Sequence, residues 1–407
     1  GYVDPERWDA GINAAYLNYQ ASAQRGRNRY NGLTASEDLL LNMGVNYGGW
    51  RVRSTQALRQ GESDKRDWVR SSTFLQRDIP GTFANITLGE TSTDGDVFRS
   101  IPVQGVLIRS DAGMLPDALQ GYAPIIRGVA QTRAKLEIRQ NGYPIYSTYV
   151  SAGPYEINDL NTAGSSAELE IILTEEDGQV RRFTQPFSTL SNLLREGVWR
   201  YSAFAGRYNA VNDLSSPLLW QSTLTVGTGW DTTLYGGLMG SDFYQAGSLG
   251  LAKDLGAIGA LAFDVTRSNA QINTTNEHSL RGMSYAIKYG KSFTTGTDLR
   301  FAGYRYSTQG YRDFDEALRE RSQYSSFFGS RRSQIVASLY QKLTNNSSVN
   351  LSLSHQDYWG TDYKQRQFQF SFNTQHKGIT YSLMASQALS DTYKNDRLIS
   401  LSVSIPL

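Results

Sequence analysis

The sequence has no cysteine and only three histidines, His278, His355 and His376, which lie far apart along its 407 residues. Without cysteine there can be no disulfide and no thiolate metal site, and the redox compartment stays undecided. Long apolar runs are also missing. The best run, residues 255–263, is interrupted by glycine and falls well short of the roughly 18 residues that a transmembrane helix needs. No signal-peptide pattern is present at the start, so we expect a mature chain or an excised part of one.

Catalytic and cofactor chemistry finds little support. Ser354, His355 and Asp357 are the residue types of a hydrolase triad, but adjacent residues of a strand point to opposite faces. No glycine-rich phosphate loop and no metal-spaced cluster of His, Asp and Glu is visible. The net charge is only +2, and a pair such as Arg331-Arg332 is typical of loops that face water or lipid headgroups. We therefore expect no enzyme, no cofactor, no metal and no nucleic-acid partner.

Aromatic residues, by contrast, are abundant in a polar chain. There are 25 Tyr, 16 Phe and 7 Trp beside 38 Gly, and the mean hydropathy is −0.44. A transmembrane β-barrel has this mixture, because its strands are apolar toward lipid and polar toward the lumen, with aromatic girdles at both interfaces. A secreted all-β protein with exposed tyrosines has the same composition, which therefore leaves both classes open.

Strict alternation of apolar and polar residues marks the later part of the chain. Leu351, Phe370 and Leu401 each lie in such a run, and their polar neighbours Ser352, Gln369 and Ser402 fall on the opposite face. The pattern repeats over some 200 residues with short turns and no helical crossover, which favours a barrel over a sandwich. We predict that Leu351, Phe370 and Leu401 face lipid. Ser352, Gln369 and Ser402 should face water.

Residues 127–189 differ in character from the rest of the chain. A strand pattern at 134–140 runs into Asn141-Gly142, and a second at 168–173 precedes Asp177-Gly178. Both dipeptides are strong signals for tight hairpin turns. We predict a compact β-sandwich of about 60 residues, inserted between early strands in residues 1–126 and later strands in residues 190–407. Its candidate functional residues are Arg127, Arg139, Asn141, Gly142, Asp159, Asp177 and Gly178.

The remaining chain is long enough for a wide barrel. At about 14–17 residues for each strand and its turn, it would supply roughly 20–25 strands. Barrels of about 22 strands enclose a lumen that needs a plug. The inserted domain has a suitable size to fill it.

Two further elements are candidates for holding the insert in place. A polar segment within residues 90–102 predicts a long hairpin just before the insert. Residues 313–321 contain good helix formers, with acidic residues first and basic residues last, which suits the helix dipole. The hairpin tip, residues 93–100, carries Asp94, Asp96 and Arg99, and the helix carries Asp313, Asp315, Glu316 and Arg319.

Short stretches spread in order over nearly the whole chain carry a specific resemblance. They are Trp8-Asp-Ala-Gly-Ile-Asn-Ala, Gly49-Trp-Arg-Val-Arg, Leu75-Gln-Arg-Asp-Ile, Gly95-Asp-Val-Phe, Leu115-Pro-Asp with Gly121-Tyr-Ala-Pro, Arg139-Gln-Asn-Gly-Tyr-Pro-Ile-Tyr, Gly153-Pro-Tyr-Glu-Ile-Asn-Asp-Leu, Leu194-Arg-Glu-Gly, Gly303-Tyr-Arg-Tyr-Ser-Thr-Gln-Gly-Tyr and Tyr358-Trp-Gly-Thr. In these stretches the sequence resembles the outer-membrane fimbrial ushers of the chaperone–usher pathway, which assemble pili.

The resemblance implies a fold and a function. The fold is all-β: a large antiparallel transmembrane β-barrel, of about two dozen strands in the family, with an inserted β-sandwich plug domain and a short helix. The function is a gated pore in the bacterial outer membrane that translocates fimbrial subunits, which a periplasmic chaperone delivers. Its partners would be chaperone–subunit complexes and the lipid bilayer, with a homodimer left open. In the family the corresponding hairpin and helix contact the plug.

The sequence departs from the family pattern at both ends. The family has an N-terminal periplasmic domain and two C-terminal ones, none of which the sequence contains, and we expect the barrel strands to be incomplete at the C-terminus. The alternative function is a plugged nutrient receptor or a porin-type channel. TonB-dependent receptors carry their plug before the barrel, however, and general porins have a constriction loop in place of a folded insert.

Overall fold

The computed structural model describes residues 12–28, 32–60, 66–110, 126–157, 160, 169–185, 193–194, 196–210, 214–272, 279–292, 299–322, 329–390 and 396–405. Within these ranges the chain forms 24 strands and one α-helix, α1 (Phe314–Arg321). Strands β1–β6 and β13–β24 belong to one 18-stranded sheet, and the other six described strands form the insert. No helix in these ranges is long and apolar enough to cross a membrane.

The chain divides into two compact units. The first comprises Gly1–Gly95, Ser100–Phe187 and Arg200–Ser222, and the second comprises Asp96–Arg99, Ser188–Trp199 and Thr223–Leu407. The helix and the four residues at the hairpin tip therefore share the second unit, while the insert shares the first unit with the early strands.

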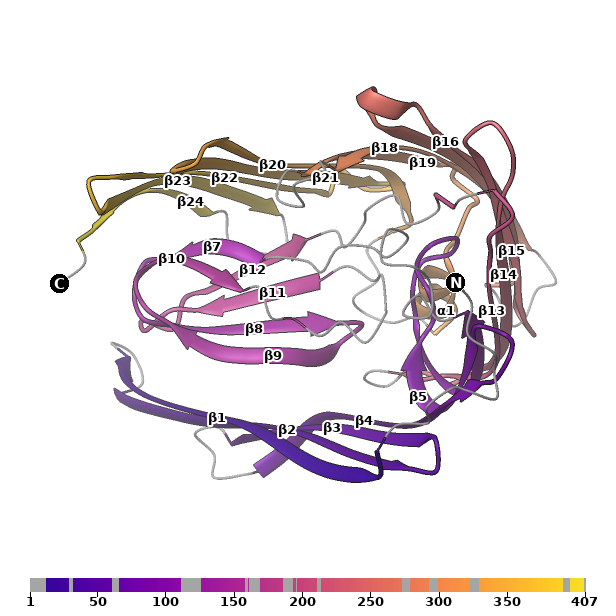
Figure 1. Cartoon of the computed structure of the whole chain (residues 1–407), viewed down its shortest axis with the longest axis horizontal. Helices are drawn as coiled ribbons and strands as arrows, with labels where there is room; N and C mark the ends of the chain where they lie inside the picture. Colours follow the sequence, from indigo (N-terminus) through magenta and orange to yellow (C-terminus); the bar gives the residue numbers. More distant parts are fainter. Residues whose placement is uncertain are drawn as a thin grey trace. The chain divides into compact units, whose positions relative to one another are not determined.

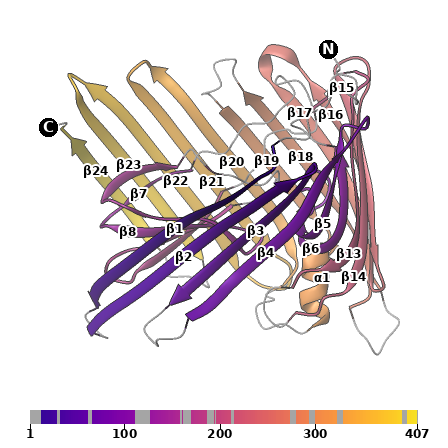
Figure 2. The ribbon, with the colours of Figure 1, turned by 60° about the horizontal axis from the view of Figure 1, so that its bottom comes forward.

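The early strands of the first unit run antiparallel, each paired with the next. They are β1 (Ala14–Asn28), β2 (Gly32–Tyr47), β3 (Trp50–Gln60), β4 (Arg66–Ile79), β5 (Ala84–Ser92) and β6 (Pro102–Ser110), and β6 also pairs with β13 (Trp199–Tyr208). Figure 2 shows β1–β4 as long strands lying side by side. At the β2–β3 turn, Gly48 and Gly49 adopt positive φ angles of 57° and 84°, which glycine tolerates without strain.

The insert consists of six strands in two small antiparallel sheets (Figure 1). They are β7 (Ile126–Ala130), β8 (Ala134–Gln140), β9 (Tyr143–Val150), β10 (Gly153–Ile157), β11 (Leu169–Thr174) and β12 (Val180–Gln185). β7 pairs with β10, and the other four are ordered β12-β11-β8-β9. The alternation predicted for residues 134–140 is present in β8: Leu136 and Ile138 are fully buried in the apolar core of the insert. The domain boundaries stay a prediction, and the first strand of the insert already begins at Ile126.

The later strands of the second unit form an antiparallel run without a helical crossover. They are β15 (Thr232–Ser241), β16 (Tyr244–Asp254), β17 (Ala260–Ala270), β18 (Leu280–Ser292), β19 (Leu299–Ser307), β20 (Arg331–Thr344), β21 (Ser347–Tyr358), β22 (Lys364–His376), β23 (Ile379–Ser390) and β24 (Asp396–Ser404). β14 (Leu218–Gly227) contributes residues to both units.

The sheet of the second unit has the polarity of a membrane protein. In β17 the buried side chains are either polar, such as Asp264 and Ser268, or alanines, whereas Leu261 and Phe263 are 40% and 50% exposed. β24 follows the predicted register, with Leu401 72% exposed and Ser402 half-buried. A soluble sheet buries its apolar face. The reverse pattern suits strands that face hydrocarbon on one side and a polar lumen on the other.

Candidate functional site

The turns of the insert place several of the predicted residues on its surface. Asn141 and Gly142 have φ angles of 53° and 78°, as a two-residue hairpin turn of type I′ requires, and this turn joins β8 to β9. Asp177 accepts a hydrogen bond from the Gln179 N–H at 3.0 Å, and Gly178 has a φ of 83°. These residues shape the ends of the insert rather than its core.

The remaining predicted residues of the insert are mostly in local ion pairs. Arg127 bonds to Glu156 at 3.2 Å, and Arg139 to Glu137 at 2.9 Å. Asp159 lies outside the described residues.

A buried carboxylate that the sequence analysis missed fastens two turns of the insert together. Glu175 accepts hydrogen bonds from the backbone N–H groups of Gln131 and Thr132, at 3.1 and 2.9 Å, and pairs with buried Arg181 at 3.7 Å. A buried charge is stable only when it is paired and hydrogen-bonded in this way. Glu175 therefore links the turn at Gln131 and Thr132 to strand β12, where Arg181 lies.

The predicted hairpin is closed by backbone and side-chain contacts where Thr93 meets Ser100 and Ile101. The Thr93 N–H donates to the Ile101 carbonyl at 3.0 Å, and the Ser100 hydroxyl donates to the Thr93 carbonyl at 2.5 Å. Asp94 forms an ion pair of 2.8 Å with Arg109 of β6. The Asn141 amide at the turn of the insert donates to the Ser100 hydroxyl at 3.0 Å, so the hairpin contacts the insert directly.

The predicted helix begins one residue later than expected. Asp313 is its N-cap, and Glu316 returns a hydrogen bond to the Asp313 N–H at 3.2 Å, which completes a capping box. The helix spans only Phe314–Arg321. Such a short helix is marginal by itself, so contacts with the rest of the second unit must maintain it.

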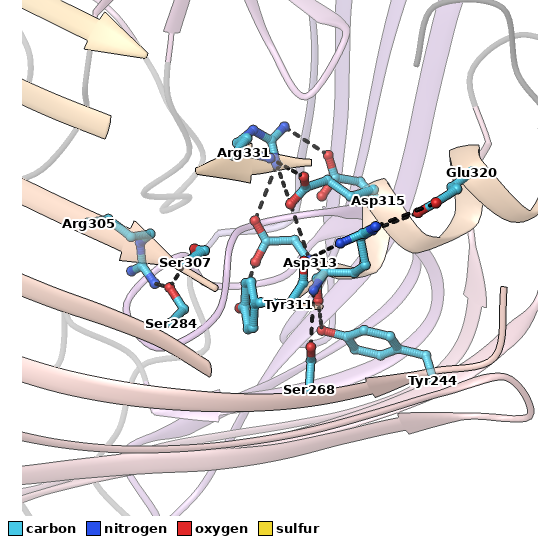
Figure 3. A network of polar contacts seen from close by, with 12 residues as sticks. Tyr244, Ser268, Ser284, Arg305, Ser307, Tyr311, Asp313, Asp315, Glu320 and Arg331 are labelled. Carbon is cyan, nitrogen blue, oxygen red and sulfur yellow. Dashed lines mark hydrogen bonds and ion pairs between the residues drawn. The ribbon is translucent and has the colours of Figure 1, made fainter. Parts of the chain in front are cut away.

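Three of the predicted acidic residues converge on one guanidinium, that of Arg331 (Figure 3). It lies 3.2 Å from Asp313, 3.2 Å from Asp315 and 3.1 Å from Glu316. The Arg331 N–H also donates to Glu316 at 2.8 Å. The expectation that Arg331 is a solvated loop charge was wrong, because it is the first residue of β20 and binds the helix.

The charges around the helix shift its carboxyl pKa values in opposite directions. Burial acts to raise the pKa of Asp315, but Arg331 and Arg99 hold it well below its usual range. Arg319 also helps to lower it. Burial raises the pKa of Glu316 to about 7, even though Arg331 opposes this change. Arg99 at the hairpin tip is thus among the positive charges that favour the ionised form of Asp315.

The opposite side of the helix packs on aromatic residues of β16 and its preceding turn. The Phe314 ring lies 5.5 Å from the rings of both Phe243 and Tyr244. The Tyr244 hydroxyl donates to the Arg312 carbonyl at 2.8 Å, and the Arg312 N–H donates to the Ser268 hydroxyl of β17 at 3.1 Å. Arg312 and Glu320 form an ion pair of 2.6 Å. The helix is thus fixed to the polar face of the sheet.

Close backbone approach makes this docking possible. A Cβ atom on Gly310 would lie 2.1 Å from the Arg281 carbonyl oxygen, and one on Gly282 would lie 2.2 Å from the Tyr311 nitrogen. Only glycine fits at both positions, so the loop before the helix can lie directly against β18. Gly310 belongs to the Gly303–Tyr311 stretch that carries part of the family resemblance.

The residues of the imagined triad do not assemble. His355 accepts a hydrogen bond from Arg366 at 3.1 Å, and Asp357 binds Ser333 and Arg332 instead.

Of the hairpin residues, Asp94 lies in the first unit, while Asp96 and Arg99 lie in the second with the helix. The sequence analysis missed the basic partners Arg109 and Arg331, for which no local pattern exists.

The second unit thus has a sheet with an apolar exposed face and a helix docked on its polar face, and the first unit contains a separately packed insert. Comparisons with known proteins identify the family. Residues 38–407 match the model of the outer membrane usher protein family, and the chain belongs to this family. The predicted family is therefore confirmed.

Two curated relatives from Escherichia coli strain K12 illustrate the match. The chain is 38% identical over 410 residues to the outer membrane usher protein YraJ, and 37% identical over 435 residues to the usher FimD. Both alignments cover 100% of this chain but only 48% and 49% of the relatives. The chain thus spans about half the length of the curated relatives it matches.

Solved structures extend the likeness to the fold. The translocation pore of the P pilus usher PapC has a TM-score of 0.83 and 29% identity, over 97% of this chain and 82% of that one. A second structure, the E. coli P pilus tip assembly intermediate PapC-PapD-PapK-PapG, has a TM-score of 0.64 and 29% identity, over 100% of this chain and 52% of that one. These matches confirm the predicted fold class, a large antiparallel β-barrel with a plug.

Proposed function

We propose that this chain is the translocation region of an outer-membrane usher. It forms a gated pore through which fimbrial subunits, delivered by a periplasmic chaperone, are exported and assembled. One observation carries the proposal: the chain has an insert with its own apolar core, set into a sheet whose exposed face is apolar. The likeness to PapC in a P pilus tip assembly intermediate supports fimbrial subunits as the exported cargo. The role is mechanical, with no catalytic step.

The proposed gate uses two sets of contacts, one between the helix and the hairpin tip and one between the hairpin and the insert. α1 is fixed to its strands by Arg331 and Tyr244, and its acidic start attracts Arg99 at the hairpin tip. The next residue, Ser100, accepts a hydrogen bond from Asn141 at the turn of the insert. The helix thereby holds the hairpin, and the hairpin holds the plug in its closed position. Release of the tip removes one support of the plug.

A chimera tests this function. Residues 1–407 replace the matching half of the usher FimD from E. coli K12. The host cells lack their own usher but supply the chaperone and the fimbrial subunits that work with FimD. We expect surface fimbriae, because the translocation region needs only to fold, open and pass the subunits. A chimera that folds in the outer membrane and passes small solutes but assembles no fimbriae would favour the porin-type alternative. Heat-modifiable migration on gels verifies folding in both cases.

A further inference from the structure

An ion pair joins the insert to strand β2 of the first unit. Lys135 of β8 binds Asp38 of β2, and each side chain is only 11% exposed. The sequence explains why both charges point toward each other. Ala134, Leu136 and Ile138 face the core of the insert, so Lys135 must face outward. On β2, buried Leu40 lies on the same face as Asp38, two residues away.

A second contact lies beside this ion pair with matching spacing. The Ser147 N–H of β9 donates to the Gln20 side-chain oxygen of β1 at 3.3 Å. Asp38 is paired in register with Ser22, two residues from Gln20. Lys135 is paired with Tyr149, likewise two residues from Ser147. The two contacts therefore bridge the same pair of wall strands and the same pair of insert strands, and Figure 1 shows β8 and β9 on the side of the insert toward β1 and β2.

The burial of the ion pair determines what it can do. Two buried opposite charges pay a desolvation penalty that their attraction only partly offsets, so the closed state gains little from the pair itself. Removal of one partner leaves the other charge buried and uncompensated, which strongly disfavours the closed state. When the insert moves away, both charges become hydrated. Such a pair holds the plug in place yet allows its release.

We propose that Asp38 and Lys135 form a second latch, which holds the insert against the first two strands of the wall, far along the sequence from the hairpin and the helix. The inference rests on the proposed function, because a latch has meaning only if the insert closes a pore. Asp38 and Lys135 are positioning residues: they set where the plug rests and do not contact the cargo.

Charge exchange in the full chain tests the latch, with ion conductance in planar bilayers as the readout. We expect Asp38→Asn and Lys135→Met each to raise the open fraction on the order of 10- to 100-fold. The double variant Asp38→Lys with Lys135→Asp restores the pair in reverse and should be quiet again. Glu37→Gln is the matched control, since exposed Glu37 neighbours Asp38 on the opposite face of β2.

The possible outcomes distinguish failure of the proposed latch from failure of the proposed function. If deletion of residues 127–189 opens the pore while Asp38→Asn and Lys135→Met stay as quiet as the parent, the latch is wrong and the plugged pore stands. If that deletion leaves the chain silent, the proposed function fails and the latch with it. Should the single variants not fold, the exchanged pair decides: a folded, quiet channel supports the latch, and a folded, leaky channel overturns it.

Discussion

The wall of the second unit and the insert are built from the same kind of strand with opposite polarity. In β17 the large apolar side chains, such as Phe263, are exposed, and the buried ones are polar, such as Asp264, or alanines. In β8 the buried residue Leu136 is apolar, and its neighbour Lys135 faces outward. Alternation with period two reveals a strand in both cases. The face that carries the apolar residues indicates whether the strand is suited to lipid or to water on its exposed side.

The difference also determines how each region is stabilised. The insert relies on burial of aliphatic side chains such as Leu136 and Leu173. The polar face of the wall must satisfy its buried groups with one another: Tyr235 donates to Asp264 at 2.9 Å, and Arg305 donates to Ser284 at 3.1 Å. A buried polar group without a partner costs about 1–3 kcal/mol. We therefore expect the wall to lose less stability than the insert when an apolar side chain is truncated, and more when a polar partner is removed.

The largest effect is expected in the core of the insert. Leu136→Ala should destabilise the insert by about 2–5 kcal/mol, because it removes a fully buried side chain and leaves a cavity. Val180→Ala at a half-exposed position of β12 should change stability by no more than about 0.5 kcal/mol. Trypsin cleavage of the insert in detergent-solubilised protein measures both. Equal cleavage of the two variants would contradict a separately packed insert.

The next effect concerns the outer face of the wall. Leu401→Arg should cost about 2–4 kcal/mol if Leu401 lies near the bilayer midplane, because it places a charge in hydrocarbon. Ser402→Arg on the opposite face of β24 should be tolerated. Refolding into lipid vesicles against a denaturant series measures both changes. If the two variants were damaged equally, the assignment of faces would be wrong.

A smaller effect is expected from the hairpin and the helix. Deletion of residues 313–321, or replacement of Asp94, Asp96 and Arg99 together by Ala, should raise basal ion conductance without unfolding the barrel. The multiple variants remove several contacts at once, so they should raise the conductance more than any single charge change. If both multiple variants conduct as little as the parent, the hairpin and helix do not hold the plug.

The smallest expected effect is a pH dependence of the basal conductance. It arises at the start of the helix, where Glu316 is surrounded by Asp313, Asp315 and Arg331. Its pKa is about 7 when docked, above its ordinary 4.5, chiefly through burial. The docked state therefore binds the proton more tightly. Its stabilisation is fully present below about pH 4.5 and is lost as the pH rises through about 7.

Basal conductance should accordingly rise from pH 5 to pH 8 in the parent. Glu316→Gln keeps the capping box and should flatten this dependence, since Gln does not titrate. A parent and a variant with the same pH profile would exclude Glu316 as the titrating group.

Sequence reasoning found the elements whose signals are local. The insert was visible from Asn141-Gly142 and from the alternation in β8, and the helix from its acidic start at Asp313. Family membership followed from stretches such as Gly303–Tyr311, and the family match confirms it. For the insert and the helix, a few adjacent residues determine the local backbone conformation.

The partners of the candidate residues could not be predicted in the same way. Arg331 binds α1 because β20 begins beside the helix, and Arg109 meets Asp94 through the pairing of β5 with β6. The contact of Lys135 with Asp38 depends on how the insert rests against β2. Each depends on strand register and docking, which a single sequence does not encode in any short pattern. The assignment of the gating residues consequently stays a proposal.

The central claim, that the insert closes a pore made by the surrounding strands, is tested most directly by deleting the insert. Single-channel conductance of the full chain should be compared with that of a variant lacking residues 127–189, after both have been shown to fold by heat-modifiable migration. We expect a nearly silent parent and a variant with large, continuously open channels. Equal conductance in the two proteins would contradict it.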